Sequence, residues 1–291
     1  MKKWFTEESY TTEAEKQALQ QKYKDKDIIW NYVKLEIAIT DYCNLACPNC
    51  SQAVPLIKNK QTMSLSHIKN IAKLTDGHFD IIKISGGEPT MHPQFREITE
   101  SLHSMFPKAK GFEMATNGFK LLEYKDIIHN FDWICLSNYP GLNDKEYNEI
   151  LKQNFPNVYP EEKIIERDLV DIKILPNIDK QNIFEHCSLK YIYKVTQDRL
   201  YPCCMLFAVS VMRTLDRTKV STKLDEEWKI NLFNLDKQTI EQYCRLCPYN
   251  INTSSYPVMI TELDQGKVRE IYPFHKGDIA KANYGIKQKE T

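Results

Sequence analysis

The chain has 291 residues, and its 39 basic and 39 acidic residues give a formal net charge of zero. This balance argues against a chain that binds nucleic acid or an anionic membrane surface through an excess of positive charge. Its longest apolar stretch, residues 202–212, is too short to cross a bilayer. The start, Met1-Lys2-Lys3, leads into Trp4-Phe5-Thr6-Glu7-Glu8 without the apolar segment of a secretory signal. We therefore expect a cytoplasmic protein with neither nucleic-acid nor membrane partners.

Strand and helix patterns alternate along the first half of the chain. Apolar and polar residues alternate over 33–39, which predicts a strand that runs into a cysteine-rich loop. Residues 65–74 have apolar side chains at helical spacing, with Ser64 as a possible N-cap. Further strands are predicted over 80–84, 111–115, 133–136 and 172–175, and further helices over 95–105 and 121–128. Strands that alternate with helices predict an α/β fold with a parallel sheet.

Three cysteines, Cys43, Cys47 and Cys50, follow the first predicted strand within eight residues. Their thiolates can hold three corners of a [4Fe–4S] cluster, which normally takes four. The next cysteine is Cys135, so one iron would stay open for a small ligand. Structural zinc would need a fourth Cys or His, and a disulfide would need an oxidising compartment.

A glycine-rich loop, Ser85–Pro89, follows the next predicted strand. Together with the three cysteines it resembles the radical S-adenosylmethionine (radical SAM) superfamily. In that family the open iron chelates the amino and carboxylate groups of S-adenosylmethionine, and reduction of the cluster yields a 5′-deoxyadenosyl radical. The resemblance implies a partial (β/α)6 TIM-like barrel. It also implies that the methionine amino group is held by Gly86, Gly87, Glu88 and Pro89.

Polar residues also follow the later strands, with Thr116 and Asn117 after the third and Ser137 after the fourth. The carboxyl ends of parallel strands share one rim, where ligands bind. The resemblance implies cofactor contacts for these residues, and the alternative is that they form ordinary strand-end turns. Asn49 stands where the family usually has an aromatic or apolar residue, and the resemblance implies that its backbone contacts adenine.

Five more cysteines lie in the second half of the chain: Cys187, Cys203, Cys204, Cys244 and Cys247. The first two flank a predicted β-hairpin over 191–201, and the last two form a Cys-x-x-Cys knuckle. This layout resembles the SPASM/twitch extension of radical SAM enzymes, and it implies a second, auxiliary [4Fe–4S] cluster. The implied ligands are Cys187, Cys203, Cys244 and Cys247, with Cys203 preferred to Cys204 because it directly follows a proline. A zinc knuckle and simple buried thiols are the alternatives.

The resemblance also divides the chain and suggests its function. It implies an N-terminal helical extension over 1–32, the radical SAM core over 33–180, a cysteine-rich unit over 181–255 and a tail over 256–291. We expect an oxidoreductase or maturase that oxidises or cross-links a peptide, with a flavodoxin- or ferredoxin-type protein as electron donor. The alternatives are dehydrogenation or epimerisation of a small sugar-like metabolite, and a non-catalytic metal-binding scaffold.

Overall fold

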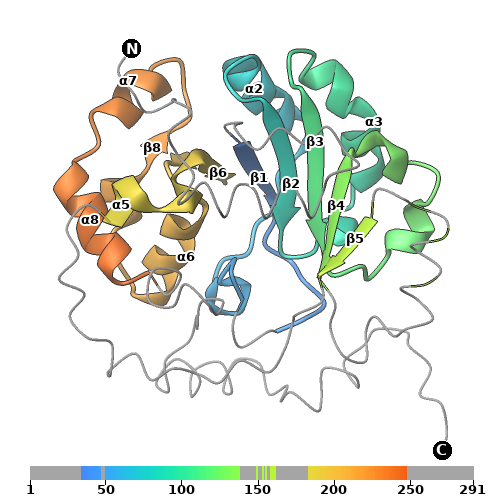
Figure 1. Ribbon diagram of the computed structural model, residues 1–291, viewed down its shortest axis with the longest axis horizontal. Coiled ribbons are helices and arrows are strands. Elements are labelled where there is room, and N and C mark those ends of the chain that lie inside the picture. Colours follow the sequence, from blue (N-terminus) through green and yellow to red (C-terminus); the bar gives the residue numbers. More distant parts are fainter. Residues whose placement is uncertain are drawn as a thin grey trace, which may run out of the picture.

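The computed structural model describes residues 34–46, 50–137, 158–161 and 183–247, together with the single residues 149, 153 and 155. One eight-stranded sheet in the order β5-β4-β3-β2-β1-β6-β7-β8 forms its framework (Figure 1). The strands are β1 Lys34–Thr40, β2 Ile81–Gly86, β3 Gly111–Thr116, β4 Trp133–Ser137, β5 Val158–Glu161, β6 Ile192–Thr196, β7 Arg199–Tyr201 and β8 Thr222–Lys223.

Parallel pairing dominates this sheet. β1 lies between β2 and β6 and pairs in parallel with both, and the pairings from β2 through β5 are parallel as well. Only β7 and β8 are antiparallel to their neighbours. The predicted α/β fold is confirmed, and this arrangement is consistent with a partial TIM-like barrel.

Helices cover the sheet and the region beside β6. The α-helices are α2 Leu65–Thr75, α3 Phe95–Met105, α5 Ile183–His186, α6 Cys204–Met212, α7 Trp228–Phe233 and α8 Lys237–Arg245. Short 3-10 helices span Val54–Leu56, Pro89–Met91, Leu121–Tyr124, Ile128–Asn130, Ser188–Tyr191 and Arg217–Val220. The predicted N-cap is confirmed, since the Ser64 side chain accepts a hydrogen bond from the His67 N–H. Among the described residues, no helix has the length and apolar character that a membrane span requires.

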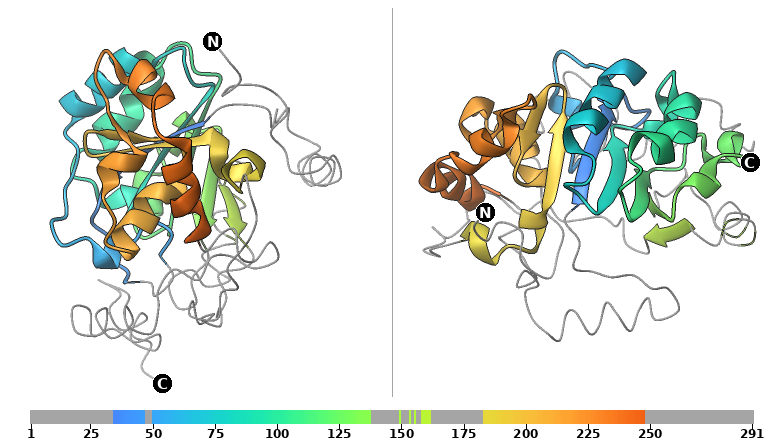
Figure 2. Two further views of the ribbon diagram at one scale, coloured as in Figure 1. Left: turned by 90° about the vertical axis from the view of Figure 1, so that its left-hand side faces the viewer. Right: turned by 90° about the horizontal axis from the view of Figure 1, so that it is seen from above.

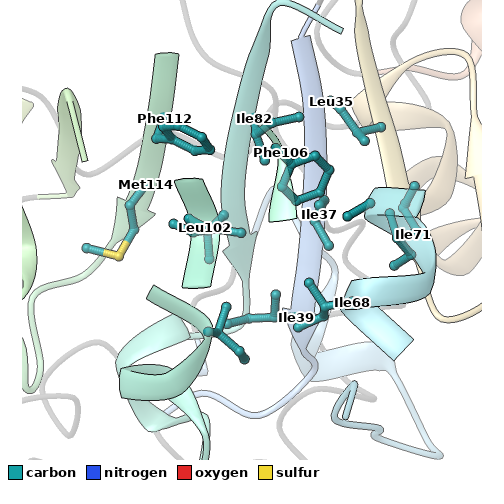
Figure 3. Packing of buried hydrophobic residues seen from close by; sticks show 14 of the residues in the cluster. Leu35, Ile37, Ile39, Ile68, Ile71, Ile82, Leu102, Phe106, Phe112 and Met114 are labelled. Atoms are coloured by element: carbon teal, nitrogen blue, oxygen red, sulfur yellow. The ribbon is translucent and has the colours of Figure 1, made fainter. Parts of the chain in front are cut away.

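Side-chain alternation on β1 separates an apolar face from a polar one. Leu35, Ile37 and Ile39 are fully buried and point towards Ile68 and Ile71 of α2 (Figure 3). The intervening side chains necessarily point to the opposite face of the sheet, because successive residues of a strand alternate. The helices therefore fix the strands from one side and leave the other side to polar residues.

The sheet and the main core cross the boundary predicted at residues 180 and 181. β6 lies directly beside β1, and Tyr193, Val195 and Leu200 belong to the same hydrophobic cluster as Leu35. The helices α6, α7 and α8 gather at this end of the sheet, away from β4 (Figure 2). We call residues 34–137 the core unit and residues 183–247 the C-terminal unit. The two units share one continuous sheet.

One predicted helix is wrong, and two strands, β5 and the two-residue β8, were missed. In place of one helix over 121–128, the chain forms two 3-10 helices, Leu121–Tyr124 and Ile128–Asn130. Leu121, Ile127 and Ile128 are buried in the core. Strand β5 was not predicted, since Val158–Glu161 is short and contains a proline. The candidate strand over 172–175, the extension over 1–32 and the tail over 256–291 lie outside the described residues.

Candidate cofactor site

The loop after β2 lies against the start of the cysteine loop after β1. The Gly87 N–H donates to the Thr40 carbonyl at 2.7 Å, and the Glu88 N–H donates to the Tyr42 carbonyl at 2.8 Å. A Cβ on Gly87 would lie 2.1 Å from the Tyr42 oxygen, and one on Gly86 would lie 2.3 Å from the Thr40 oxygen. Gly86 also has φ +135°, which side chains disfavour. Both glycines are therefore required for the two loops to meet.

The Glu88 carboxylate joins the β2 loop to the β3 loop. It is fully buried, and Oε1 accepts hydrogen bonds from the Thr90 N–H at 3.0 Å, the Thr90 hydroxyl at 2.5 Å and the Thr116 hydroxyl at 2.6 Å. Oε2 accepts one from the Asn117 N–H at 2.7 Å. Burial raises the pKa of Glu88, and these hydrogen bonds oppose the rise. These contacts make Glu88 a bridge between loops, and its expected contact with the methionine amino group stays a prediction.

Asn117 connects the β3 loop to the first cysteine. Its Nδ2 donates to the Asn44 Oδ1 at 2.9 Å and lies 3.6 Å from the Cys43 Sγ. The Leu45 N–H donates to the same sulfur at 3.3 Å. Asn44 is itself buried, and its Nδ2 has no hydrogen-bond partner among the described residues. Sequence reasoning missed Asn44, whose only signal was its place between two cysteines.

Cys50 is the second loop cysteine that the structure places. Burial raises the pKa of this thiol, and the nearby backbone N–H groups of Val54 and Gln52 oppose the rise. Sulfur atoms that accept backbone N–H groups are typical ligands of iron–sulfur clusters. Cys43 and Cys50 thus fit this ligand role, whereas Cys47 and Asn49 lie outside the described residues.

The remaining predicted rim residues lie beside this group. Pro89 begins the 3-10 helix for which Glu88 is the N-cap. Ser137 ends β4, next to the pair formed by Thr116 of β3 and Leu136 of β4. The structure therefore brings together the predicted residues that follow β1, β2 and β3. Ser137 lies at the end of β4, the strand next to β3.

Charged side chains line the polar face of the sheet below this rim. Glu36 of β1 accepts from Lys194 of β6 at 3.0 Å and lies 3.9 Å from Lys83 of β2. Lys83 lies 3.2 Å from Glu113 of β3, which also pairs with Lys34. Burial alone would raise the pKa of both carboxyls, but the adjacent ammonium groups lower each to about 2. We call these five residues the inner-face network, and sequence reasoning did not predict them.

Cys135 also lies on this face, although its neighbours Ile134 and Leu136 in β4 are buried in the apolar core. Its sulfur accepts a hydrogen bond from the Trp133 indole N–H at 3.1 Å and lies 3.7 Å from a Glu113 carboxylate oxygen. The thiol is half-buried and polar in its contacts. Alternation along a strand explains the difference, because Cys135 points away from the apolar neighbours Ile134 and Leu136.

The C-terminal cysteines gather in an apolar cluster. Cys203, Cys244 and Cys247 are buried within it, beside Phe207 and Tyr243. A hydrogen bond with Cys204, together with burial, raises the pKa of Cys203 well above its usual range, and the nearby Cys187 and Cys247 add to this rise. Three of the four predicted ligands therefore share one apolar cluster, and Cys187 and Cys204 lie near Cys203. Within the described part of the chain, no three His, Cys, Asp or Glu side chains are placed to hold a single metal ion.

Comparison with known proteins agrees with this geometry. Residues 37–137 match the Radical SAM superfamily model. Over this range the chain is similar to the radical SAM superfamily. The fold agrees, since the structure superposes on BtrN in complex with AdoMet and 2-DOIA with a TM-score of 0.52 at 15% identity, over 76% of this chain and 89% of that one.

Curated relatives match part of the chain. GTP 3′,8-cyclase of Synechocystis sp. is 28% identical over 42% of this chain and 37% of its own length. The Alkaliphilus oremlandii enzyme of the same name is 30% identical over 42% of this chain and 38% of its own. A mitochondrial GTP 3′,8-cyclase of Arabidopsis thaliana is 36% identical over 30% of this chain and 23% of its own. The chain therefore matches less than two-fifths of the length of each of these relatives.

Proposed function

We propose that the chain is a radical SAM enzyme that uses the thiols of Cys43, Cys47 and Cys50 to hold a [4Fe–4S] cluster with one open iron. The observation that carries this proposal is the fixed contact between the cysteine loop and the Gly86–Glu88 loop. Backbone hydrogen bonds at 2.7 and 2.8 Å join these loops. A non-catalytic scaffold would have no chemical need to keep these two loops in contact.

When bound, the cluster and S-adenosylmethionine supply reductive cleavage to a 5′-deoxyadenosyl radical, which abstracts a hydrogen atom from substrate. The protein's task is to hold both partners in contact and exclude water. Gly86 and Gly87 allow the close approach, while Glu88 and Asn117 fix the loops around it. We assign the rim residues Thr116 and Ser137 to cofactor contacts, and we infer that a flavodoxin- or ferredoxin-type protein supplies the electron.

We further propose that Cys187, Cys203, Cys244 and Cys247 ligate an auxiliary [4Fe–4S] cluster in a SPASM/twitch-like unit. Their support is that Cys203, Cys244 and Cys247 share one apolar cluster and that Cys187 lies near Cys203. Four thiolates would saturate such a cluster, so it would act as an electron relay. An electron acceptor near the substrate suits a net oxidation, which favours an oxidoreductase.

The inner-face network favours a small polar substrate over the peptide expected at first. Three ammonium groups and two carboxylates occupy this face, and Lys34 and Lys83 keep 22% and 18% of their side chains exposed. A face of this kind suits a ligand that is itself charged or rich in hydrogen-bonding groups. The match to GTP 3′,8-cyclases points the same way, since their name specifies a nucleotide. A peptide is the second candidate.

The chemistry can be tested with the anaerobically purified full chain. We expect reduction with dithionite in the presence of S-adenosylmethionine to release 5′-deoxyadenosine, and Cys43→Ala to abolish the release. Cys135→Ser is the matched control, because it removes a cysteine outside both ligand sets. Loss of activity in the control, or no release from the wild type, would contradict the proposal.

The substrate class needs a separate experiment. We expect polar metabolites and nucleotides to raise the rate of 5′-deoxyadenosine release above the substrate-free rate, and Lys83→Met to remove this stimulation while leaving the basal rate. Stimulation by peptides alone would reverse the order of the two candidates.

A further inference from the structure

Lys194 connects the C-terminal unit to the loop that follows Cys50. It lies on β6 and is fully buried, with its Nζ 3.0 Å from Glu36 Oε1 and 5.7 Å from the centre of the Phe207 ring. The same ammonium group donates a hydrogen bond to the side-chain oxygen of Gln52. Lys194 is 142 residues from Gln52 in sequence, so only the parallel β1–β6 pairing brings them together.

Gln52 is held at both ends of its amide. Its Nε2 donates to Glu36 Oε1 at 3.1 Å, while its Oε1 accepts from Lys194. Glu36 and Lys194 occupy paired positions on β1 and β6, so both anchors belong to the rigid sheet. The side chain of Gln52 is therefore fixed relative to the strands and not merely to its own loop.

The backbone of Gln52 contacts the cysteine. Its N–H lies close to the Cys50 thiol and, with that of Val54, opposes the rise in the pKa of this thiol. The next residue, Ala53, has φ 52°, and its N–H donates to the Cys50 carbonyl at 2.9 Å. A non-glycine residue in the left-handed region persists only where its surroundings hold it. Ala53 is also buried, and the adjacent Gln52 ties this turn to the sheet through its side chain.

We propose that Lys194 is a positioning residue for the three-thiol loop: through Gln52 it keeps a backbone N–H on the Cys50 sulfur and so raises the reduction potential of the cluster held there. The inference rests on the proposed function. Hydrogen bonds to ligand sulfur stabilise the more negative, reduced state of a cluster, and second-shell groups that orient them tune the potential. The C-terminal unit thus contributes to the first site through a strand of its own.

The test is a redox titration of the full chain, in which the first cluster is followed by the part of the electron paramagnetic resonance signal that S-adenosylmethionine changes. Gln52→Leu keeps the net charge and the backbone N–H but removes both anchors, so we expect a lower midpoint potential. Lys194→Met should lower the midpoint potential at least as far. Lys194→Arg should bring it most of the way back to the wild-type value. Lys83→Met is the matched control, since Lys83 carries the same charge in the same network but has no contact with Gln52 among the described residues.

The possible results distinguish a failure of the positioning role from a failure of the proposed function. A wild-type potential in Gln52→Leu would overturn the positioning role even if Lys194→Met failed to fold, because Gln52 is only half-buried. An equal shift of the midpoint potential in Lys83→Met and Lys194→Met would show that the loss of charge alone causes it. This result would also overturn the positioning role. A wild-type chain without any signal that responds to S-adenosylmethionine would contradict the proposed function itself, and the inference with it.

Discussion

The two cysteine sites differ in their surroundings although both use thiols. The three-thiol loop of the core unit lies at the rim of a parallel sheet, where Asn117 and Leu45 donate hydrogen bonds to the Cys43 sulfur and the Gln52 N–H lies close to Cys50. Cys203, Cys244 and Cys247 of the C-terminal unit lie in an apolar cluster with Phe207 and Tyr243. Polar donors allow a ligand to bind and a potential to be tuned, whereas an apolar shell protects a closed site from water. The contrast suggests one site for chemistry and one for electron transfer.

Removal of cysteines should separate the two sites most clearly. Cys50→Ala should lower 5′-deoxyadenosine release by a factor of at least about 100, because one corner of the open cluster is lost. The double variant Cys244→Ala/Cys247→Ala should lose about half of the iron and keep the release of 5′-deoxyadenosine. The measurements are the iron and sulfide content and the amount of 5′-deoxyadenosine released. Unchanged iron in the double variant would show that Cys244 and Cys247 hold no auxiliary cluster.

The glycine contact at the rim should be the next most sensitive feature. Gly87→Ala places a Cβ 2.1 Å from the Tyr42 carbonyl oxygen, so the two loops must separate. We expect a loss of roughly 2–3 kcal/mol in the free energy of unfolding and S-adenosylmethionine binding weakened at least about tenfold. Gly111→Ala is the control, because its nearest contact is the Ile81 side chain at 3.1 Å. Equal binding in both variants would show that the loop contact is not needed.

The inner-face network predicts a loss of stability in acid. The pKa values of Glu36 and Glu113 fall from 4.5 to about 2 on folding. Their contribution is therefore complete above pH 4.5 and is lost as the pH falls towards 2, and it amounts to roughly 3 kcal/mol for each group at most. Denaturant unfolding between pH 5 and 3 should show a steeper loss in the wild type than in Glu113→Gln/Lys83→Met, which lacks the three ion pairs that Glu113 and Lys83 form. Equal slopes would contradict these pKa values.

Glu88→Gln tests the bridge between the β2 and β3 loops. An amide NH2 would replace one oxygen that now accepts from Thr90, Thr116 or Asn117, so a donor would face a donor. We expect a loss of about 1–3 kcal/mol in the free energy of unfolding, a several-fold weaker binding of S-adenosylmethionine and unchanged iron. Glu123→Gln, on an exposed residue, is the control. Weaker binding without any loss of stability would favour direct contact between Glu88 and the cofactor over the bridging role.

The sequence predicted the rim well because its signals are local. The alternation over 33–39 gave β1, the two motifs fixed the loops that follow β1 and β2, and the cap at Ser64 was correct. The hairpin over 191–201 is also confirmed, with Gln197 in its turn at φ 57°. In each case neighbouring residues determine the conformation.

The features that were missed depend on distant partners. No local pattern indicates that β6 pairs with β1, and therefore none indicates that Lys194 meets Glu36 and Gln52. The bridging role of Glu88 was likewise hidden, because two of its four donors, on Thr116 and Asn117, belong to the loop after β3. Buried polar networks assemble through tertiary pairing, so their members become visible only in the folded chain.

The most direct test of the central claim uses the variant Cys244→Ala/Cys247→Ala, in which the three-thiol loop holds the only expected cluster. Its reduced electron paramagnetic resonance spectrum should change when S-adenosylmethionine is added, because the ligand binds an open iron. An iron–sulfur signal that does not respond to S-adenosylmethionine, or a chain that holds no iron, would contradict the account.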